Sequence, residues 1–341
     1  MSEKKDSSVD KKWLYCPGCG NKLPPIQNLK FCIKCGLNLS SYQPNLTSQS
    51  IQPIQYGIEK LSIEELLEAN DKQLWGISAS IGLPILAFII MSFLGAGILI
   101  FIALANLNLN YLEELATNTY FVVISSLLEL LFILIPVVYV GKYLKRPKLN
   151  DRLMLLGFTT KGYKKIEILK EVLIGLGFAF IGILSVFGVT LIMELILFNN
   201  DVMSAGEVDA MIANTDALGL FFLVLVMLLV IGTSEELLFR GFMQKGLVRS
   251  KLGEKWGIFI TAIIFTMIHL VTYIVALMFG EISLGIFTAS FISAFFPYLT
   301  ISLLLGWLFR WRGENLIAVM ITHGAYDAIL FILAFLLYNV V

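Results

Sequence analysis

Two histidines and a pair of adjacent glutamates are the residues of this sequence whose types and surroundings could support catalysis. The chain of 341 residues has only two histidines, His269 and His323, and each lies within an apolar stretch. Glu235 and Glu236 stand at the end of another apolar stretch. Ionisable side chains are costly within a bilayer, and those found there commonly serve a function. We therefore treat these four residues as candidates for an intramembrane site.

The spacing around these residues predicts two helical pairs. Glu236 and Arg240 are four positions apart, so on a helix they share a face and can form an ion pair. Glu235 is rotated about 100° from Glu236 and is not committed to Arg240. Asp327 follows His323 by four positions, on one helix face. One ion pair plus one snorkelling acid would be a structural explanation of the glutamates, but it leaves the two intramembrane histidines unexplained.

Two chemistries fit this set of side chains. A carboxylate beside neutral imidazoles can deprotonate water while a donor opposite stabilises an oxyanion. Alternatively, Glu235, His269, His323 and Asp327 could bind a divalent metal ion with an open position and activate its water. Either arrangement could hydrolyse a peptide bond. The sequence has neither the HExxH motif of zincins nor the GxSxG motif of serine hydrolases.

Long apolar helices must position these side chains. The chain is 57% hydrophobic and 15% charged, whereas soluble domains are about 25% charged. Stretches of about 18 or more apolar residues can cross a bilayer as helices. The composition excludes an ordinary soluble enzyme and a disordered chain. We predict an all-α polytopic membrane protein with about seven transmembrane helices, give or take one, near 75–105, 120–142, 170–198, 216–239, 256–279, 284–309 and 314–340.

Three residues in these stretches can interrupt a helix. Gly82 and Pro84 suggest an interfacial segment before the first crossing, because the first stretch is long for one span. Pro297 predicts a kink or break in the sixth span.

The distribution of charge predicts the topology. All 25 Lys and Arg lie in four places, which are the segment before the first span, 142–170, 240–255, and Arg310 with Arg312. The connections at 106–119, 199–215 and 280–283 have none. The positive-inside rule therefore predicts a cytoplasmic N-terminus in a multi-pass protein of the cell membrane. We expect no cleavable signal peptide, because no apolar core follows Met1, and no nucleic-acid partner.

Four cysteines form a CxxC pair repeated after twelve residues, in Cys16-Pro-Gly-Cys19-Gly and Cys32-Ile-Lys-Cys35-Gly. Each turn can offer two thiolates to one tetrahedral ion, and the following Gly lets the turn close. The spacing predicts a zinc ribbon whose closed four-cysteine site is structural. Two disulfides are the alternative, which a reducing cytoplasm disfavours.

The cysteine motif and the start of the apolar stretches divide the chain into three parts. We expect a zinc ribbon at 13–40, a linker with a short amphipathic helix at 41–73, and a transmembrane domain at 74–341, which the resemblance described next implies to be a protease domain. The ribbon resembles the short zinc-ribbon domains that precede many prokaryotic membrane proteins.

The transmembrane part resembles the CPBP family, which comprises the CAAX proteases and bacteriocin-processing or self-immunity proteins (Abi). That family is marked by EExxxR, FxxxH and then HxxxN or HxxxD. The corresponding residues here, in the same order and within about 120–340, are Glu235-Glu236-x-x-x-Arg240, Phe265-x-x-x-His269 and His323-x-x-x-Asp327.

The resemblance implies an intramembrane endopeptidase with a cavity open to the cytoplasmic side. It implies that Glu235 is the general base, that His269 helps to hold the water, and that Glu236 and Arg240 fix the helix. It also implies that His323 and residue 327 stabilise the oxyanion. The family is described both as metalloproteases and as glutamate-dependent proteases.

Asp327 departs from the Asn of the eukaryotic CAAX enzymes. An ionised Asp cannot donate a hydrogen bond to an oxyanion. It must therefore be protonated, orient His323 or bind metal. The departure also weakens the expectation of a prenylated CAAX substrate. Phe265 is expected to pack either under the His269 imidazole or simply in the core.

The expected partners are membrane lipid, a peptide or membrane-anchored protein substrate, and a protein bound through the zinc ribbon. A transporter or channel is an alternative, with the Glu/His cluster as a proton or metal relay and Glu129 completing the path. The sequence shows no inverted repeat to support it. A non-catalytic scaffold that recruits partners through the ribbon is a third reading. We expect structural roles for Glu129 and Glu194.

Overall fold

A computed structural model describes residues 74–105, 115, 117–145, 147–160, 162–197 and 212–340 of this chain. The predicted zinc ribbon, with Cys16, Cys19, Cys32 and Cys35, lies outside the described residues, as does the predicted segment 41–73. The described residues form helices and contain no β-strand. The predicted all-α class is confirmed.

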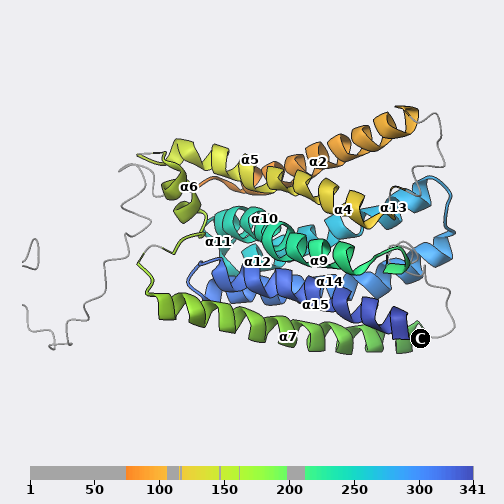
Figure 1. The fold of residues 1–341 in the computed structure, drawn as a ribbon. Coiled ribbons are helices and arrows are strands. Elements are labelled where there is room, and N and C mark those ends of the chain that lie inside the picture. Colours follow the sequence, from red (N-terminus) through yellow and green to blue (C-terminus); the bar gives the residue numbers. More distant parts are fainter. Residues whose placement is uncertain are drawn as a thin grey trace, which may run out of the picture. The chain divides into compact units, whose positions relative to one another are not determined.

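The helices follow one another with short connections (Figure 1). In chain order they are α2 (Ile77–Ala105), α4 (Thr119–Ser125), η1 (Ser126–Glu129), α5 (Leu130–Val140), η2 (Gly141–Tyr143), α6 (Leu149–Leu155), α7 (Lys165–Ile196), α9 (Ala217–Val226), η3 (Met227–Ile231), α10 (Gly232–Glu236), η4 (Leu237–Gln244), α11 (Lys245–Val248), α12 (Gly253–His269), α13 (Val271–Met278), α14 (Leu284–Trp311) and α15 (Ile317–Val340). Of the elements labelled η, η1 and η2 are 3₁₀-helical, whereas η3 and η4 are π-helical.

Six of these continuous helical stretches are long and apolar enough to cross a membrane, and the bent pair α12–α13 makes a seventh if it counts as one span. The prediction of about seven spans is confirmed, and the chain is a multi-pass membrane protein. Successive spans run in opposite directions (Figure 1). The ends of α5 and α11 therefore lie at the same end of the helices as the starts of α7 and α12, and we call this the basic end.

Neither Pro84 nor Pro297 breaks its helix, and an unexpected break is present elsewhere. α2 runs unbroken through Gly82 and Pro84, and α14 runs unbroken through Pro297. Proline inside a membrane helix is tolerated because neighbouring groups can satisfy the freed carbonyl. The break lies instead at Leu270, where α12 meets α13 at 44°. His269 is therefore the last residue of α12.

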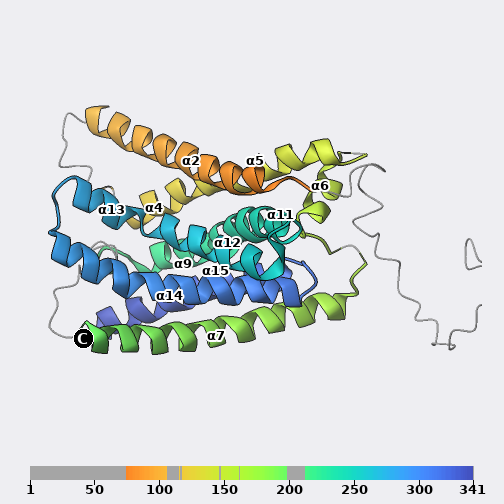
Figure 2. The same cartoon turned by 180° about the vertical axis from the view of Figure 1, so that it is seen from behind.

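α15 is the central packing partner of the other helices. It packs along α7 (Figures 1 and 2) and also contacts η3 and α10. At the crossing, a Cβ built on Gly232 would lie 2.6 Å from the backbone nitrogen of Gly324. A Cβ on Gly324 would lie 2.8 Å from the carbonyl oxygen of Met227. Only glycine permits so close an approach of the two backbones, and this approach brings α10 against the turn that carries His323.

An ion-pair network ties the helices together at the basic end. Glu314, in the turn between α14 and α15, lies 2.7 Å from Arg249 and 3.4 Å from Lys245, and it also pairs with Arg310. Burial alone would raise the pKa of the Glu314 carboxyl, but the neighbouring cations Lys245, Arg249 and Arg310 outweigh it and lower this pKa below its ordinary value. The carboxylate thus stays ionised while it holds α11 against the α14–α15 turn.

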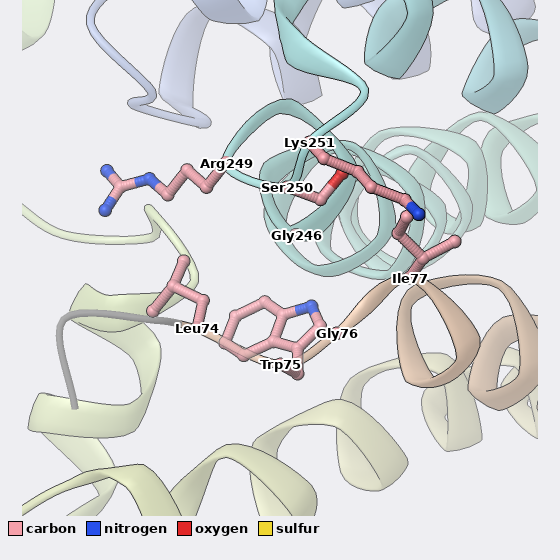
Figure 3. Close-up of a pocket in the computed structure, with 8 residues that line it drawn as sticks. All are labelled: Leu74, Trp75, Gly76, Ile77, Gly246, Arg249, Ser250 and Lys251. Carbon is pink, nitrogen blue, oxygen red and sulfur yellow. The ribbon is translucent and has the colours of Figure 1, made fainter.

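A cavity of about 240 Å³ lies beside this network, between the start of α2 and the end of α11 (Figure 3). Trp75 forms one wall, with its ring stacked on Phe242 at 4.5 Å and its indole N–H donated to the Phe242 carbonyl oxygen over 3.0 Å. Arg249 and Lys251 line the opposite side. The Trp75 contacts fasten the start of α2 to the helix that carries the two glutamates.

Candidate active site

Glu235 and Glu236 lie in a helix that changes its winding on both sides of them. The span Ala217–Val248 is continuous, but the five α-helical residues of α10 stand between the π-helical segments η3 and η4. π-Helical turns are rare and are frequently found at functional sites. Here they flank the short α-helical segment that carries both carboxylates.

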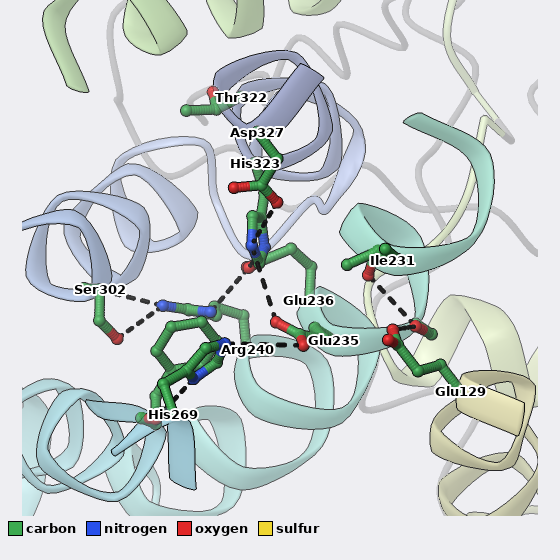
Figure 4. Close-up of polar contacts among 12 residues, drawn as sticks. Glu129, Ile231, Glu235, Glu236, Arg240, His269, Ser302, Thr322, His323 and Asp327 are labelled. Atoms are coloured by element: carbon green, nitrogen blue, oxygen red, sulfur yellow. Dashed lines mark hydrogen bonds and ion pairs between the residues drawn. The ribbon is translucent and has the colours of Figure 1, made fainter. Parts of the chain in front are cut away.

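Glu236 is fully buried and is shared by two partners (Figure 4). Its Oε1 accepts a hydrogen bond from Nη1 of Arg240 over 2.6 Å, which confirms the predicted pair. The same oxygen lies 2.6 Å from Nδ1 of His323. Because a carboxylate only accepts, Nδ1 must carry the proton of this bond. The sequence did not predict this second contact.

Arg240 is held on two further sides. Its Nη2 donates to the Ser302 hydroxyl over 2.8 Å and to the Ser302 carbonyl over 3.2 Å. Its guanidinium carbon lies 4.7 Å from the centre of the Phe265 ring, which provides a cation–π contact. The buried guanidinium thus has a carboxylate, a hydroxyl and an aromatic face around it, while its Nε has no hydrogen-bond partner among the described residues.

Glu235 takes no part in the Arg240 pair and faces both histidines. Its Oε1 lies 3.9 Å from Nε2 of His269, and its Oε2 lies 3.7 Å from Nε2 of His323. These distances are too long for direct hydrogen bonds and suit groups that share a water molecule. Oε2 is buried and has no hydrogen-bond partner among the described residues, so a polar group is needed beside it.

The two imidazoles present the same nitrogen to Glu235. Nδ1 of His269 lies 2.9 Å from the Phe265 carbonyl oxygen and therefore donates to it. The Phe265 ring also packs on His269, with centres 4.3 Å apart, so the expected contact under the imidazole is present. With each Nδ1 donating elsewhere, Nε2 of both rings is directed to the reactive side, a common way to fix a histidine tautomer.

Asp327 lies on the open side of this cluster. Its Oδ2 is 3.3 Å from Nε2 of His323. Of the three roles considered for Asp327, this contact fits the orientation of His323 and also a protonated Asp327 that donates to Nε2, because Nδ1 of His323 donates to Glu236. The Asp327 and His269 side chains are 28% and 25% exposed, whereas those of Glu236 and Arg240 are fully buried. The cluster therefore has a closed side that positions it and an open side where another molecule can approach.

Three contributors to the site lacked a clear signal in the sequence. Ser302 is one ordinary serine in an apolar helix, yet it binds Arg240. Glu129, expected to be structural, accepts a hydrogen bond from the Ser234 hydroxyl over 3.2 Å, one residue from Glu235 (Figure 4). Tyr298 lies over His269, with ring centres 5.0 Å apart. Glu194, by contrast, is exposed on α7.

The described residues contain no group of three or more His, Cys, Asp or Glu side chains placed to hold a metal ion. Glu235, His269, His323 and Asp327 have the donor types that such an ion prefers, but their present spacing does not form such a group. We therefore derive no catalytic step through a metal ion, and the sequence-based alternative of a divalent metal stays a prediction to be tested by metal analysis.

Residues 217–329 match the model of the family described as type II CAAX prenyl endopeptidase Rce1-like. The match begins at α9 and ends in α15, so it contains all six candidate residues, Glu235, Glu236, Arg240, His269, His323 and Asp327. No curated protein and no solved structure matches the chain.

Proposed function

We propose that this membrane protein, whose residues 217–329 match the type II CAAX prenyl endopeptidase Rce1-like family model, is an intramembrane endopeptidase of the CPBP family with Glu235 as its general base. The observation that carries this proposal is the position of Glu235. Its carboxylate is buried, unpaired with Arg240, and flanked by Nε2 of both His269 and His323 at 3.9 and 3.7 Å. This is the surrounding that a water-activating carboxylate requires.

In the proposed reaction, a water molecule lies between the Glu235 carboxylate and the two imidazoles. Glu235 takes one proton from this water, and the water oxygen attacks the carbonyl carbon of the scissile peptide bond. The carbonyl electrons move to its oxygen, which becomes an oxyanion. When the C–N bond breaks, protonated Glu235 returns the proton to the leaving nitrogen.

The residues behind Glu235 keep the site in place. Glu236 holds the Nδ1 proton of His323 and compensates Arg240, while Ser302 and Phe265 hold the guanidinium. None of these groups needs to move during the reaction. This preorganisation supports catalysis, because the site does not spend binding energy on ordering its own dipoles.

The substrate we propose is a peptide segment of a membrane-anchored protein, cleaved near the cytoplasmic face of the cell membrane. The side of cleavage depends on the predicted topology, in which the basic end faces the cytoplasm. The zinc ribbon at 13–40 would then lie in the same compartment and could bind the substrate or a protein partner.

The test is a survey of peptide termini in source cells that express either the wild-type chain or Glu235→Gln at equal levels. Gln keeps the size of the side chain but cannot take a proton. We expect new termini in wild-type cells only, because loss of a general base slows the reaction by about 10² to 10⁴. Glu194→Gln, which removes an exposed carboxylate from α7, serves as the matched control. Equal termini in all three strains, with each protein folded, would contradict the proposal.

One observation favours the transport alternative, namely that the hydroxyl of Ser234, the residue before Glu235, donates a hydrogen bond of 3.2 Å to Glu129 of η1. A proton relay through these groups would conduct protons in proteoliposomes, and Glu129→Gln would stop this conduction. Wild-type protein that conducts no protons above empty liposomes would remove this alternative.

A further inference from the structure

The cavity of about 240 Å³ between the start of α2 and the end of α11 shares no residue with the catalytic cluster (Figure 3). At about 30 Å³ for each water-sized group, it has room for about eight such groups. Arg249 and Lys251 line it, and none of the described residues that line it is acidic. A concave site lined by charge of one sign attracts ligands of the opposite sign. The cavity therefore suits an anion.

Lys251 is the cation with which a ligand can pair most directly. It is exposed in the turn between α11 and α12, and it forms no ion pair with another described residue. Its side chain reaches toward Ile77 at the start of α2, whereas Arg249 leaves the same segment on the other side (Figure 3). Nη2 of Arg249 lies 2.7 Å from Glu314, which offsets part of the Arg249 charge. The remaining N–H groups of this guanidinium can still donate to a ligand.

The start of α2 adds backbone donors to the same cavity. Gly76 and Ile77 line it, and Ile77 is the first residue of this helix of 29 residues. The first N–H groups of a helix have no carbonyl partner within it. Gly76 has no side chain to cap them, and the first turn contains no acidic residue. The positive end of the α2 dipole therefore favours an anion here, in addition to the charge of Lys251.

Two other polar groups of the cavity are already committed to the protein. The indole N–H of Trp75 donates to the Phe242 carbonyl oxygen over 3.0 Å. The Ser250 hydroxyl donates to the Leu247 carbonyl oxygen over 2.6 Å. The donors left for a ligand are therefore cationic side chains and helix N–H groups, which together suit the oxygens of a phosphate group.

The surface next to the cavity favours a phosphate that belongs to a lipid. Beyond Ile77, α2 is strongly apolar, and only 6% of its most apolar stretch is buried within the described structure. Its exposed side chains include Ile85, Leu86 and Ile89. Acyl chains attached to a phosphate in the cavity could therefore lie along α2. Basic pockets between membrane helices on the cytoplasmic side bind anionic headgroups in this way.

We propose that this cavity binds the phosphate group of an anionic phospholipid, with Lys251 and the first N–H groups of α2 as its donors and the acyl chains along α2. A zwitterionic lipid would bring its own cation beside Lys251 and Arg249, so an anionic headgroup binds more tightly. The bound lipid joins the start of α2 to the segment that follows the two glutamates. The site does not depend on the protease proposal.

The first experiment titrates full-length protein, purified in a neutral detergent and freed of lipid, and counts bound ligands by native mass spectrometry. The probes are phosphatidylglycerol, phosphatidylcholine and inorganic phosphate. We expect phosphatidylglycerol to bind most tightly and Lys251→Gln to weaken this binding about fivefold. Lys170→Gln, which removes an exposed cation of α7 at the same basic end, should change it less than about twofold.

Three results would overturn the proposal. Lys251→Gln that binds phosphatidylglycerol as tightly as wild type would show that this lysine is not in the site. Equal affinity for phosphatidylcholine and phosphatidylglycerol would show that the charge of the headgroup is not recognised. Inorganic phosphate that binds as tightly as phosphatidylglycerol, and is lost in Lys251→Gln, would identify a free phosphate as the ligand in place of a lipid.

A second pair of variants covers the case in which Lys251→Gln does not fold. Nothing lies within 4 Å of a Cβ built on Gly76, and Asp and Asn are both favoured immediately before a helix. Gly76→Asp and Gly76→Asn should therefore both fold, but only Asp places a negative charge in the cavity. We expect phosphatidylglycerol to bind Gly76→Asp at least about fivefold more weakly than Gly76→Asn. Equal binding by these two variants would mean that the phosphate does not lie at the start of α2.

Discussion

Oε1 of Glu236 lies 2.6 Å from Nη1 of Arg240 and also 2.6 Å from Nδ1 of His323. One carboxylate oxygen therefore joins the cation of its own helix to an imidazole of α15. This contact fixes the tautomer of His323 and directs its Nε2 toward Glu235. Glu236 is thus a positioning residue for the histidine, in addition to the role of fixing its helix that the family resemblance implied.

Glu236→Gln is expected to lower stability and to impair cleavage. The change leaves Arg240 buried without a counter-charge, and removal of one partner of a buried ion pair costs about 3–5 kcal/mol. Thermal unfolding of purified protein measures the loss. Glu254→Gln is the control, because Glu254 is 55% exposed in its pair with Arg310 and should contribute less than about 1 kcal/mol. Equal stability of both variants would mean that the Glu236–Arg240 pair does not hold the helix.

Gly324→Ala is expected to separate α15 from η3 and α10. The added Cβ would lie 2.8 Å from the carbonyl oxygen of Met227, and backbone atoms cannot yield as a flexible side chain can. We expect activity to fall more than stability, because His323 would move away from Glu235. Gly177→Ala is the control, since nothing lies within 4 Å of a Cβ there. Unchanged cleavage by Gly324→Ala would show that the close crossing is not required.

Glu314 is expected to make stability depend on pH below the ordinary carboxyl pKa of 4.5. Its folded-state pKa is lowered, despite the opposing effect of burial, by Lys245, Arg249 and Arg310. Because this pKa is lowered, the ionised carboxylate stabilises the folded state fully above the ordinary carboxyl pKa of 4.5. This stabilisation is lost as pH falls below 4.5 and through the lower folded-state pKa. Unfolding measured between neutral pH and pH 3 should show this loss. Glu314→Gln should remove that part of the pH dependence, whereas Glu281→Gln, on an exposed residue, should retain it.

The predicted zinc ribbon should bind one zinc ion per chain, which elemental analysis of purified protein can measure. Cys16→Ser is expected to release this ion because a thiolate ligand is lost. The helical content of the membrane domain should remain unchanged. A second metal ion that is lost on His269→Ala but retained in Cys16→Ser would show that the catalytic cluster also binds metal. One ion that persists in Cys16→Ser would contradict the ribbon.

The membrane helices were predictable from the sequence because the signal is long and redundant. Eighteen or more apolar residues specify a span whatever their order, and each span is supported by many residues. Interruptions were less predictable. Pro84 and Pro297 lie inside continuous helices, while the break at Leu270 has neither proline nor glycine at its position. The positions of proline and glycine therefore do not by themselves show where these helices break.

The core of the candidate site was likewise predictable, because buried ionisable residues in a membrane must find one another. Glu235, His269 and His323 lie together as expected. Their surroundings were not predictable. Ser302 reaches Arg240 from 62 positions away in the sequence, and serine is common in membrane helices. Tyr298 has no distinctive neighbours in sequence. Such contacts depend on the relative rotation of helices, which the hydropathy of a single sequence does not specify.

The shared carboxylate has a consequence for how the protein is made. Arg240 and Glu236 belong to one span, so they can neutralise each other as soon as that span enters the bilayer. His323 comes 87 residues after Glu236 and emerges from the ribosome roughly 4–17 s later at synthesis rates of about 5–20 residues per second. During this interval the local pair keeps the helix compatible with lipid. Arrival of the last helix then completes the assembly, a sequence of events that crosslinking between nascent helices can follow in time.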